Sequence, residues 1–148
     1  MKDKKLLLRI ITPRGKKVEQ KADMLVMRCV GGDVGILPNH MPLSSPISDG
    51  ILRIINGKEE QKMALFGGVV EVKNNIVTIL TSIAQRPEEI DLARAEHDRK
   101  QYEQLMQERS SDLKMQSYSV LLRRALVRIE VSSEPIISGS DIDESDDI

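Results

Sequence analysis

The chain contains few aromatic residues and one cysteine. Of its 148 residues, one is Phe, two are Tyr and none is Trp, so it lacks the aromatic side chains on which single-stranded nucleic acids usually stack. The lone Cys29 excludes a disulfide framework and a multi-cysteine metal site, and we expect a reducing, intracellular environment. No apolar run approaches the roughly 18 residues of a membrane-spanning helix. We also expect neither a signal peptide nor a transit peptide.

Positive charge is absent from residues 131–148, which carry six Asp and Glu side chains. Residues 1–130 therefore hold 22 basic and 17 acidic groups, and this small excess is well short of a nucleic-acid-binding surface. The Ser, Asp and Gly content after Val131 predicts a disordered acidic tail over 132–148. We interpret the tail acids as unpaired solvated charge rather than as Ca²⁺ ligands, and we expect no metal site.

Short β-rich runs separated by turn signals fill the chain up to about residue 84. One run alternates, with Leu25, Met27 and Cys29 on the same side. Asn56-Gly57 lies between two such runs and predicts a type I′ hairpin turn, because both residues tolerate positive φ. Asn74-Asn75 marks a second hairpin. Eight to ten short strands of this kind predict an all-β sandwich or barrel.

From Pro87 onward the hydrophobic period becomes helical. We predict one helix from Pro87, at its first position, to about Arg109, and a second from about Leu113 to Glu130. The short connection makes these helices an antiparallel hairpin. Its apolar faces are narrow, and short isolated helices are marginal in water, so the hairpin must pack on the sandwich or on a partner. A choice between those two would act as a switch.

The stretch at residues 32–43 combines glycines, which can take positive φ, with prolines, which fix φ. We expect a loop of fixed shape with a buried underside formed by Val34, Ile36 and Leu37. The serines that follow His40 lie in no nucleophile motif, and no phosphate-loop lysine is present. The stretch therefore indicates a docking surface rather than a catalytic loop, with His40 as a polar turn residue.

Two further groups of charged residues allow more than one interpretation. Arg124 and Arg128 share a helix face, with Arg123 beside them. They are either a solvated face or a docking face for an acidic partner or a phosphate, which the planar guanidinium suits. The spacing of Asp91 and Arg94 is common as simple helix decoration.

Four motifs in this order make residues 5–131 resemble the epsilon subunit of F-type ATP synthases. They are Gly-Asp-Val-Gly-Ile-Leu-Pro-Asn-His-Met-Pro-Leu at 32–43, Gly-Gly-Val-Val-Glu-Val at 67–72, Glu-Ile-Asp-Leu-Ala-Arg-Ala at 89–95 and Arg-Ala-Leu-Val-Arg-Ile at 124–129. The resemblance implies a ten-stranded β-sandwich over 1–85 and a two-helix hairpin over 86–131. It implies no role for the tail at 132–148.

The resemblance also implies a function. Such a subunit is a non-catalytic part of the rotor, between the c-ring and the gamma subunit, on the cytoplasmic face of the membrane and without inserting into it. Its hairpin either folds onto the sandwich or extends toward the catalytic alpha and beta subunits, where it suppresses ATP hydrolysis. The resemblance assigns the c-ring and gamma interface to Asp33, Pro38, His40 and Pro42. It assigns the inhibitory contact with the catalytic ring to Arg123, Arg124 and Arg128.

The resemblance further implies a regulatory ATP site, whose residues would be Ile90, Asp91, Arg94, Ala95, Arg124 and Arg128. An acid can accept from adenine or orient an arginine, and arginines bind a triphosphate bidentately. The chain has Gln85 and Gln101 where strong ATP binders carry Glu and Arg, so we predict weak binding of ATP and no other cofactor.

Three alternatives stay open at this point. The chain could be an ATP-sensing sandwich and hairpin module, a hydrolase or transferase that uses His40, or a sandwich adaptor unrelated to the synthase.

Overall fold

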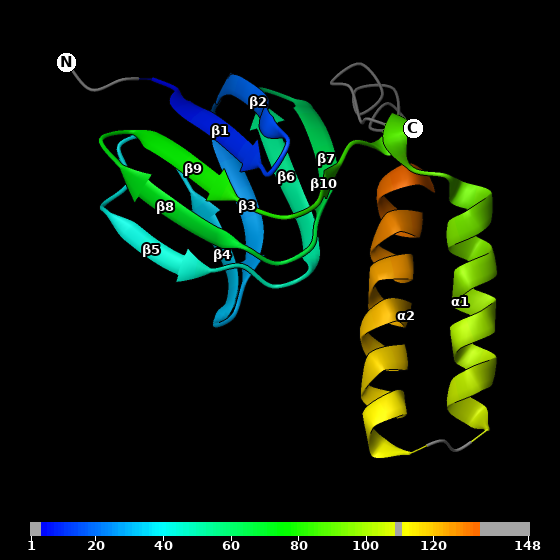
Figure 1. Cartoon of the computed structure of the whole chain (residues 1–148). Helices are drawn as coiled ribbons and strands as arrows, with labels where there is room; N and C mark the ends of the chain where they lie inside the picture. Colours follow the sequence, from blue (N-terminus) through cyan, green and yellow to red (C-terminus); the bar gives the residue numbers. More distant parts are fainter. Residues whose placement is uncertain (1–3, 109–110, 134–148) are drawn as a thin grey trace, which may run out of the picture.

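Two five-stranded sheets pack face to face, and a helical hairpin lies against one of them (Figure 1). The computed structural model describes residues 4–108 and 111–133. The first sheet has the order β2 (Gly15–Ala22), β1 (Leu6–Thr12), β9 (Ile76–Leu80), β8 (Val69–Lys73) and β5 (Leu43–Pro46). The second has the order β10 (Ala84–Gln85), β7 (Glu59–Leu65), β6 (Gly50–Asn56), β3 (Met24–Cys29) and β4 (Gly32–Ile36). The expected ten-stranded sandwich is therefore confirmed.

The core between the sheets is built from alternate residues of these strands. Leu25, Met27 and Cys29 are buried on the inner side of β3, as the alternation predicts. Strand β1 lies between β2 and β9 in the first sheet and pairs in parallel with β9, so that Leu8 lies opposite Val77. The core is aliphatic and contains Met27 and Met63, because the chain has almost no aromatic residues to fill it.

The prediction of a type I′ turn at Asn56-Gly57 is wrong in its details. Asn56 still pairs with Glu59 in the β6–β7 ladder, and only Gly57, at 61°, has a positive φ in this turn. Glycine at the first central position is typical of a type II′ turn. Asn56 stays in the strand because its side-chain amide donates to the carbonyl oxygen of Lys21 at 3.2 Å. The type I′ signature is found instead at Asn74 and Asn75, whose φ values are 52° and 63°.

The stretch at 32–43, which was predicted to be a loop, begins with a strand. Its first five residues form β4, which pairs with β3 at one edge of the second sheet. Ile36 is fully buried and Val34 packs partly against the core, but Leu37 is 56% exposed. The expectation that Leu37 is buried fails because β4 ends at Ile36 and the chain then turns away from the sheet.

The hairpin consists of a 3-10 turn, η1 (Pro87–Glu89), followed by α1 (Leu92–Gln107) and α2 (Asp112–Ser133). The first helix does not begin at Pro87. Ile90 is extended, and Asp91 caps α1 by accepting a hydrogen bond from the backbone N–H of Arg94 at 3.1 Å. The extended backbone at Ile90 lets its side chain pack against the sandwich while Asp91 caps α1. A helix that continued from Pro87 would not allow both.

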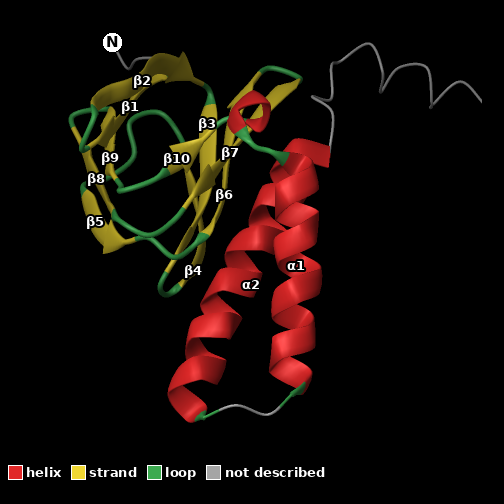
Figure 2. Ribbon diagram, turned by 45° about the vertical axis from the view of Figure 1, so that its right-hand side comes forward, coloured by secondary structure: helices red, strands yellow, loops and turns green. Residues whose placement is uncertain are grey.

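Figures 1 and 2 show α2 between α1 and the sandwich, with the connection between the helices at the end remote from η1. The helices contact each other along their length, and the rings of Tyr102 and Tyr118 lie 6.1 Å apart. No helix among the described residues is long and apolar enough to cross a membrane. Of the tail predicted over 132–148, Ser132 and Ser133 belong to α2, and residues 134–148 lie outside the described residues.

Candidate functional site

The hairpin is anchored to the sandwich by the C-terminal part of α2. Val131 of α2 forms a buried cluster with Ala64 and Phe66 of the sandwich. Four partly buried residues complete this cluster: Ile51, Ile83, Ile90 and Val127. The contact is apolar but small, because only the last turns of α2 take part in it (Figure 2).

Two arginines of α2 cover the ring of Phe66. The guanidinium carbons of Arg124 and Arg128 lie 5.3 and 4.5 Å from the ring centroid. This is cation–π geometry, and its strength rises when the groups are shielded from water. Phe66 is the only phenylalanine in the chain and is 3% exposed. The ring therefore belongs to the apolar cluster and also contacts the two arginine side chains.

Asp49, in the connection between β5 and β6, is the acidic partner of the hairpin. Arg124 donates from Nε to Asp49 Oδ2 at 3.1 Å, and Arg123 Nη2 lies 3.8 Å from the same oxygen. The Asp49 side chain is only 9% exposed. A carboxylate so shielded needs a charged partner, and Arg124 provides it only while α2 lies on the sandwich.

Arg128 lies deeper and is less well paired. Its Nε donates to Gln85 Oε1 at 2.8 Å. Burial lowers the pKa of Arg128, nearby Arg124 and Arg94 act in the same direction, and Asp98 opposes them. Holding this cation against the sandwich thus has an electrostatic cost, which makes the docked arrangement easier to reverse.

A cavity of about 330 Å³ adjoins Arg128 between η1, α1 and α2. It is lined by Gln85, Glu89, Ile90, Asp91, Arg94, Ala95, Asp98 and Arg128. Five of the six residues that the resemblance assigns to a nucleotide therefore come together here. The sixth, Arg124, is directed to Asp49 instead.

The charges around this cavity are mixed. Three carboxylates line it beside two arginines. Asp91 uses one carboxylate oxygen to cap α1, and Glu89 pairs with Lys17 of β2. Acids at these positions repel a free triphosphate, so the electrostatics agree with weak binding at most. Among residues 4–108 and 111–133, no group of three or more His, Cys, Asp or Glu side chains could hold a metal ion.

The four residues assigned to the rotor interface lie at the two ends of β4. Asp33 is exposed near the start of the strand, opposite Arg28 of β3. Pro38, His40 and Pro42 follow the other end, so Asp33 and Pro38 are separated by about 16 Å of extended chain. The structure thus places Asp33 and the other three residues at opposite ends of β4 rather than in one cluster, with the three in the connection that leads to β5 of the first sheet.

The 37–42 connection is held in a defined shape. Asn39 adopts a positive φ of 64°, and its backbone N–H donates to Asn75 Oδ1 at 2.8 Å. His40 Nδ1 lies 2.6 Å from the carbonyl oxygen of Met41, a contact that requires the ring proton on Nδ1. Leu37 and Met41 project outward and are 56% and 73% exposed. A rigid loop with exposed apolar side chains is suited to docking.

The sequence patterns did not identify Asp49 and Phe66 as functional residues. Asp49-Gly50 carries only a turn signal, and the acid lies 75 residues before its partner Arg124. Phe66 carries one usable signal, since it is the single phenylalanine of the chain.

Comparisons with known proteins divide the chain at the same place as the structure, between the sandwich and the hairpin. Residues 5–87 match the family model of the ATP synthase delta/epsilon chain β-sandwich domain, and residues 88–133 match that of its long α-helix domain. The ATP synthase epsilon chain of Halalkalibacterium halodurans is 36% identical over 128 residues, which are 86% of this chain and 96% of the relative. That of Desulfitobacterium hafniense is 38% identical over 126 residues, which are 84% of this chain and 94% of the relative.

The fold is also similar to that of a solved chain. A chain in the cryo-EM structure of the Euglena gracilis mitochondrial ATP synthase, with OSCP, F1 and c-ring, superposes with a TM-score of 0.76. The match covers 90% of this chain and 84% of that chain at 18% sequence identity. At this identity the similarity supports the fold alone.

Proposed function

The chain belongs to the ATP synthase delta/epsilon family, and from this premise we propose that it is a rotor subunit of a proton-translocating F-type ATP synthase. Its relatives are epsilon chains, which are stalk or regulatory subunits, so the chain is a non-catalytic subunit. In the proposed role it couples the c-ring to the gamma subunit at the cytoplasmic face of the membrane.

The edge of the sandwich along β4 is the proposed contact with the c-ring and gamma. Asp33 offers an exposed carboxylate at one end of the strand. Pro38, His40 and Pro42 lie in the rigid connection at the other end, beside the exposed Met41. A preformed surface binds with little loss of conformational entropy.

The second part of the proposal is that the hairpin leaves the sandwich and inhibits ATP hydrolysis. The observation that carries it is the composition of the docking interface, which combines a small apolar cluster with charged contacts of Arg123, Arg124 and Arg128. Released arginines would be free to contact acidic groups on the alpha and beta subunits. Two arrangements that differ by a few kcal/mol are the requirement for such a switch.

Substitutions at Asp49 and at the arginines distinguish two roles of the arginines, docking on the sandwich and inhibition of hydrolysis. The ATP hydrolysis rate of the assembled ATP synthase is measured. Asp49→Asn removes the negative charge that pairs with Arg123 and Arg124 in the docked state and leaves the arginines intact, so we expect a hydrolysis rate several-fold lower than that of the unmodified complex. Changing Arg123, Arg124 and Arg128 together to Ala also weakens docking but removes the inhibitory contact, so we expect a higher rate. Glu96→Gln, on the exposed side of α1, is the matched control and should leave the rate unchanged.

The diagnostic result is a lower hydrolysis rate for Asp49→Asn together with a higher rate for the triple Ala variant. If both variants leave the rate at the control value, the inhibitory role is wrong and the hairpin is only a structural part of the stalk.

A regulatory nucleotide site is a second candidate function, favoured by the five assigned residues that line one cavity. We expect ATP to bind weakly, with a Kd near the millimolar range, or about −4 kcal/mol. Calorimetric titration of the isolated chain with Mg-ATP tests this, with Arg94→Ala as the site variant and Arg99→Ala as the control. Absence of heat up to several millimolar ATP, or equal heats for both variants, would exclude the site.

A further inference from the structure

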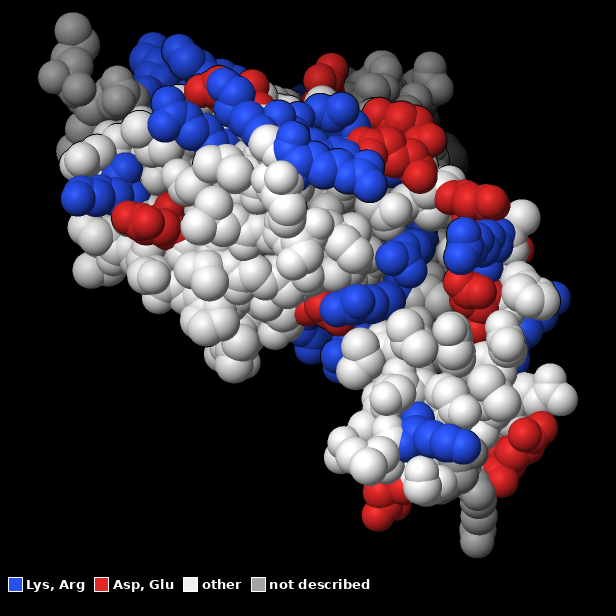
Figure 3. All heavy atoms as spheres, viewed as in Figure 1, with Lys and Arg blue, Asp and Glu red and all other residues white. Residues whose placement is uncertain are grey.

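Positive charge is concentrated on one edge of the sandwich. Residues 4–23, which form β1, β2 and their connections, contain seven Lys or Arg and two acidic residues. Their excess of five positive charges equals that of the whole of residues 1–130. Figure 3 shows these side chains gathered along the β1–β2 edge, while the adjoining face over β9, β8 and β5 is mostly uncharged. We call residues 4–23 the β1–β2 basic surface.

The few acids on this surface do not neutralise it. Glu19 pairs with both Arg9 and Lys16, and Asp23 pairs with Lys5 at 3.3 Å. Lys4, Arg14 and Lys21 have no acidic partner among the described residues. The surface therefore has positive charge available for an acidic ligand.

One end of this surface lies next to the end of α2. Val131, in the last turns of α2, packs in the same cluster as Ile90, which directly follows η1. Glu89 of η1 pairs with Lys17 of β2. The side chain of Arg86 also donates to the carbonyl oxygen of Lys17 at 3.4 Å. The segment around η1 thus contacts both α2 and strand β2.

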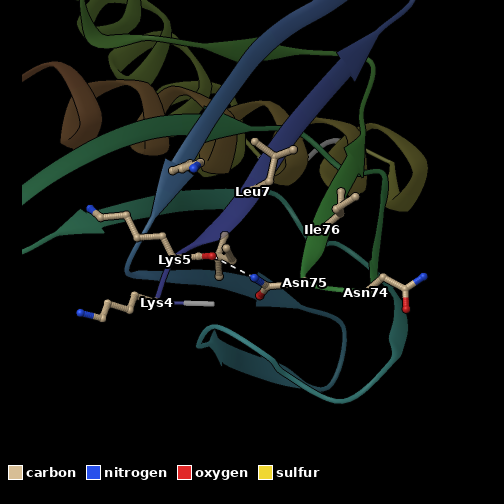
Figure 4. A pocket seen from close by; sticks show the side chains of 8 residues that line it. Lys4, Lys5, Leu7, Asn74, Asn75 and Ile76 are labelled. Atoms are coloured by element: carbon tan, nitrogen blue, oxygen red, sulfur yellow. Dashed lines mark hydrogen bonds between the residues drawn. The ribbon is translucent and has the colours of Figure 1, made fainter. Parts of the chain in front are cut away.

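The other end of the surface is hollowed. A cavity of about 430 Å³ is lined by the side chains or backbone of Lys4, Lys5, Leu6, Leu7, Lys21, Asn74, Asn75 and Ile76 (Figure 4). Asn75 closes one wall by donating to the carbonyl oxygen of Lys5 at 2.8 Å. Three lysines around a cavity favour a carboxylate-rich segment over an apolar one.

We propose that the β1–β2 basic surface binds the acidic segment 134–148 of the same chain. That segment carries six acidic residues and no Lys or Arg, and it lies beyond the two family models, which end at residues 87 and 133. Its first acid, Glu134, immediately follows the last residue of α2. From there to Asp141 the extended chain spans at most about 26 Å, the length of the eight residues of β2. Attachment to α2 raises the effective concentration of the segment at this surface to the millimolar range, so many weak ion pairs suffice.

A spin label near the end of the segment tests this on the full chain. Ser145→Cys provides the attachment point, since the natural Cys29 is buried. We expect the label to reduce the NMR intensities of the amides of residues 15–22 to less than half at about 50 mM salt. The amides of β5, at the opposite edge of the same sheet, should keep their intensities. At about 0.5 M salt the effect on β2 should disappear, because charges are then screened within about 4 Å.

Two sets of variants identify the interacting groups. Changing Asp141, Asp143, Glu144, Asp146 and Asp147 to their amides should abolish the loss of intensity on β2. Arg14→Ala with Lys21→Ala should weaken it several-fold, whereas the matched pair Lys73→Ala with Lys100→Ala, both exposed on other elements, should not. These changes lie outside the core, so the variants are expected to fold.

Three results would overturn the inference. The first is an equal loss of intensity on β2 and β5, and the second is an effect that persists in the amide variant. The third is transfer of the effect between molecules when a spin-labelled chain without ¹⁵N is mixed with a ¹⁵N chain that lacks the spin label. After either of the first two results, the lysines of β2 would serve only to protect an edge strand from pairing. After the third result, the surface would bind the segment of another chain and not that of its own. The rotor assignment does not depend on any of these outcomes.

Discussion

The backbone conformation and the close neighbours of Gly68 require a glycine at this position. Its φ is 121°, and a Cβ at this position would lie 2.1 Å from the carbonyl oxygen of Leu80. Its own carbonyl accepts a hydrogen bond from the backbone N–H of Ile47 at 2.8 Å. The chain here passes so close to the end of β9 that only glycine fits, which gives a physical reason for the Gly-Gly pair that begins the motif at 67–72.

We expect Gly68→Ala to destabilise the sandwich by on the order of 3 kcal/mol, because both the φ and the space exclude a methyl group. Urea unfolding followed by circular dichroism measures the change. Gly31→Ala is the control, since a Cβ added there would have no atom within 4 Å and its φ is not in the left-handed region. If the two variants unfold at the same urea concentration, the close approach at Gly68 is not a constraint on stability.

Glu89 links the stability of the hairpin junction to pH. The hydrogen bond from Lys17 lowers the pKa of Glu89 below its ordinary value of 4.5, against the opposing effect of burial. A lowered carboxyl pKa stabilises the folded state above pH 4.5, and the contribution is lost as the pH falls through the folded-state pKa. The pair is partly exposed, so its contribution is at most about 0.5–1 kcal/mol.

Glu89→Gln should therefore reduce stability by up to about 0.5–1 kcal/mol at pH 7 and by less near pH 3. Urea unfolding at the two pH values measures the difference. Glu88→Gln removes an adjacent exposed carboxylate and should change little at either pH. A pH-independent effect of Glu89→Gln would show that the pair with Lys17 does not operate.

At the scale of elements, the attachment of α2 depends on its last turns. Val131 is 0% exposed in the cluster with Ala64 and Phe66, whereas Leu126 of the same helix is 46% exposed. The narrow apolar face of the hairpin thus contributes to docking at a few positions. The second helix was predicted to end at Glu130, so the prediction did not include Val131, although α2 continues to Ser133.

Val131→Ala should weaken docking by about 1–2 kcal/mol, since it removes two buried methyl groups from a packed cluster. Amide hydrogen exchange in the last turns of α2 should become about ten-fold faster or more. Leu126→Ala removes more apolar surface from an exposed site and should change the exchange rates much less. Equal acceleration by both variants would mean that helix stability, not docking, controls the exchange.

Alternating hydrophobicity predicted the strands because it reflects a local property, the two faces of a sheet. It placed Leu25, Met27 and Cys29 in the core correctly. The errors at Asn56 and Ile90 arose where a tertiary contact overrode local preference, through the hydrogen bond to Lys21 and the cluster around Phe66.

The candidate site was predictable only in part for the same reason. Five of the assigned residues do line one cavity: Ile90, Asp91, Arg94, Ala95 and Arg128. Asp49 could not be identified, because its role depends on a contact with Arg124 that spans 75 residues. Periodicity and turn chemistry carry no information about pairs so far apart in the chain.

At the scale of the molecule, the sandwich and the hairpin differ in how they are stabilised. The sandwich has a continuous core between two five-stranded sheets. The hairpin has one buried residue in α1, Ala95, and reaches the sandwich through the small cluster around Phe66 and through Asp49. A rigid part joined to a weakly held part is the arrangement that the proposed release of the hairpin requires.

A chain that ends at Arg86 should therefore fold cooperatively without the hairpin. Its loss of stability should be about 1.5–3 kcal/mol, the contribution of burying one large apolar side chain such as Phe66. The experiment compares urea unfolding of the shortened and full chains by circular dichroism and by NMR of the β-strand amides. Phe66→Ala in the full chain should cost more than in the shortened chain, because only the full chain places Arg124 and Arg128 on the ring. A shortened chain that unfolds without a cooperative transition would show that the hairpin is part of the folding unit, and the proposed exchange between docked and extended hairpins would then be too costly to act as a switch.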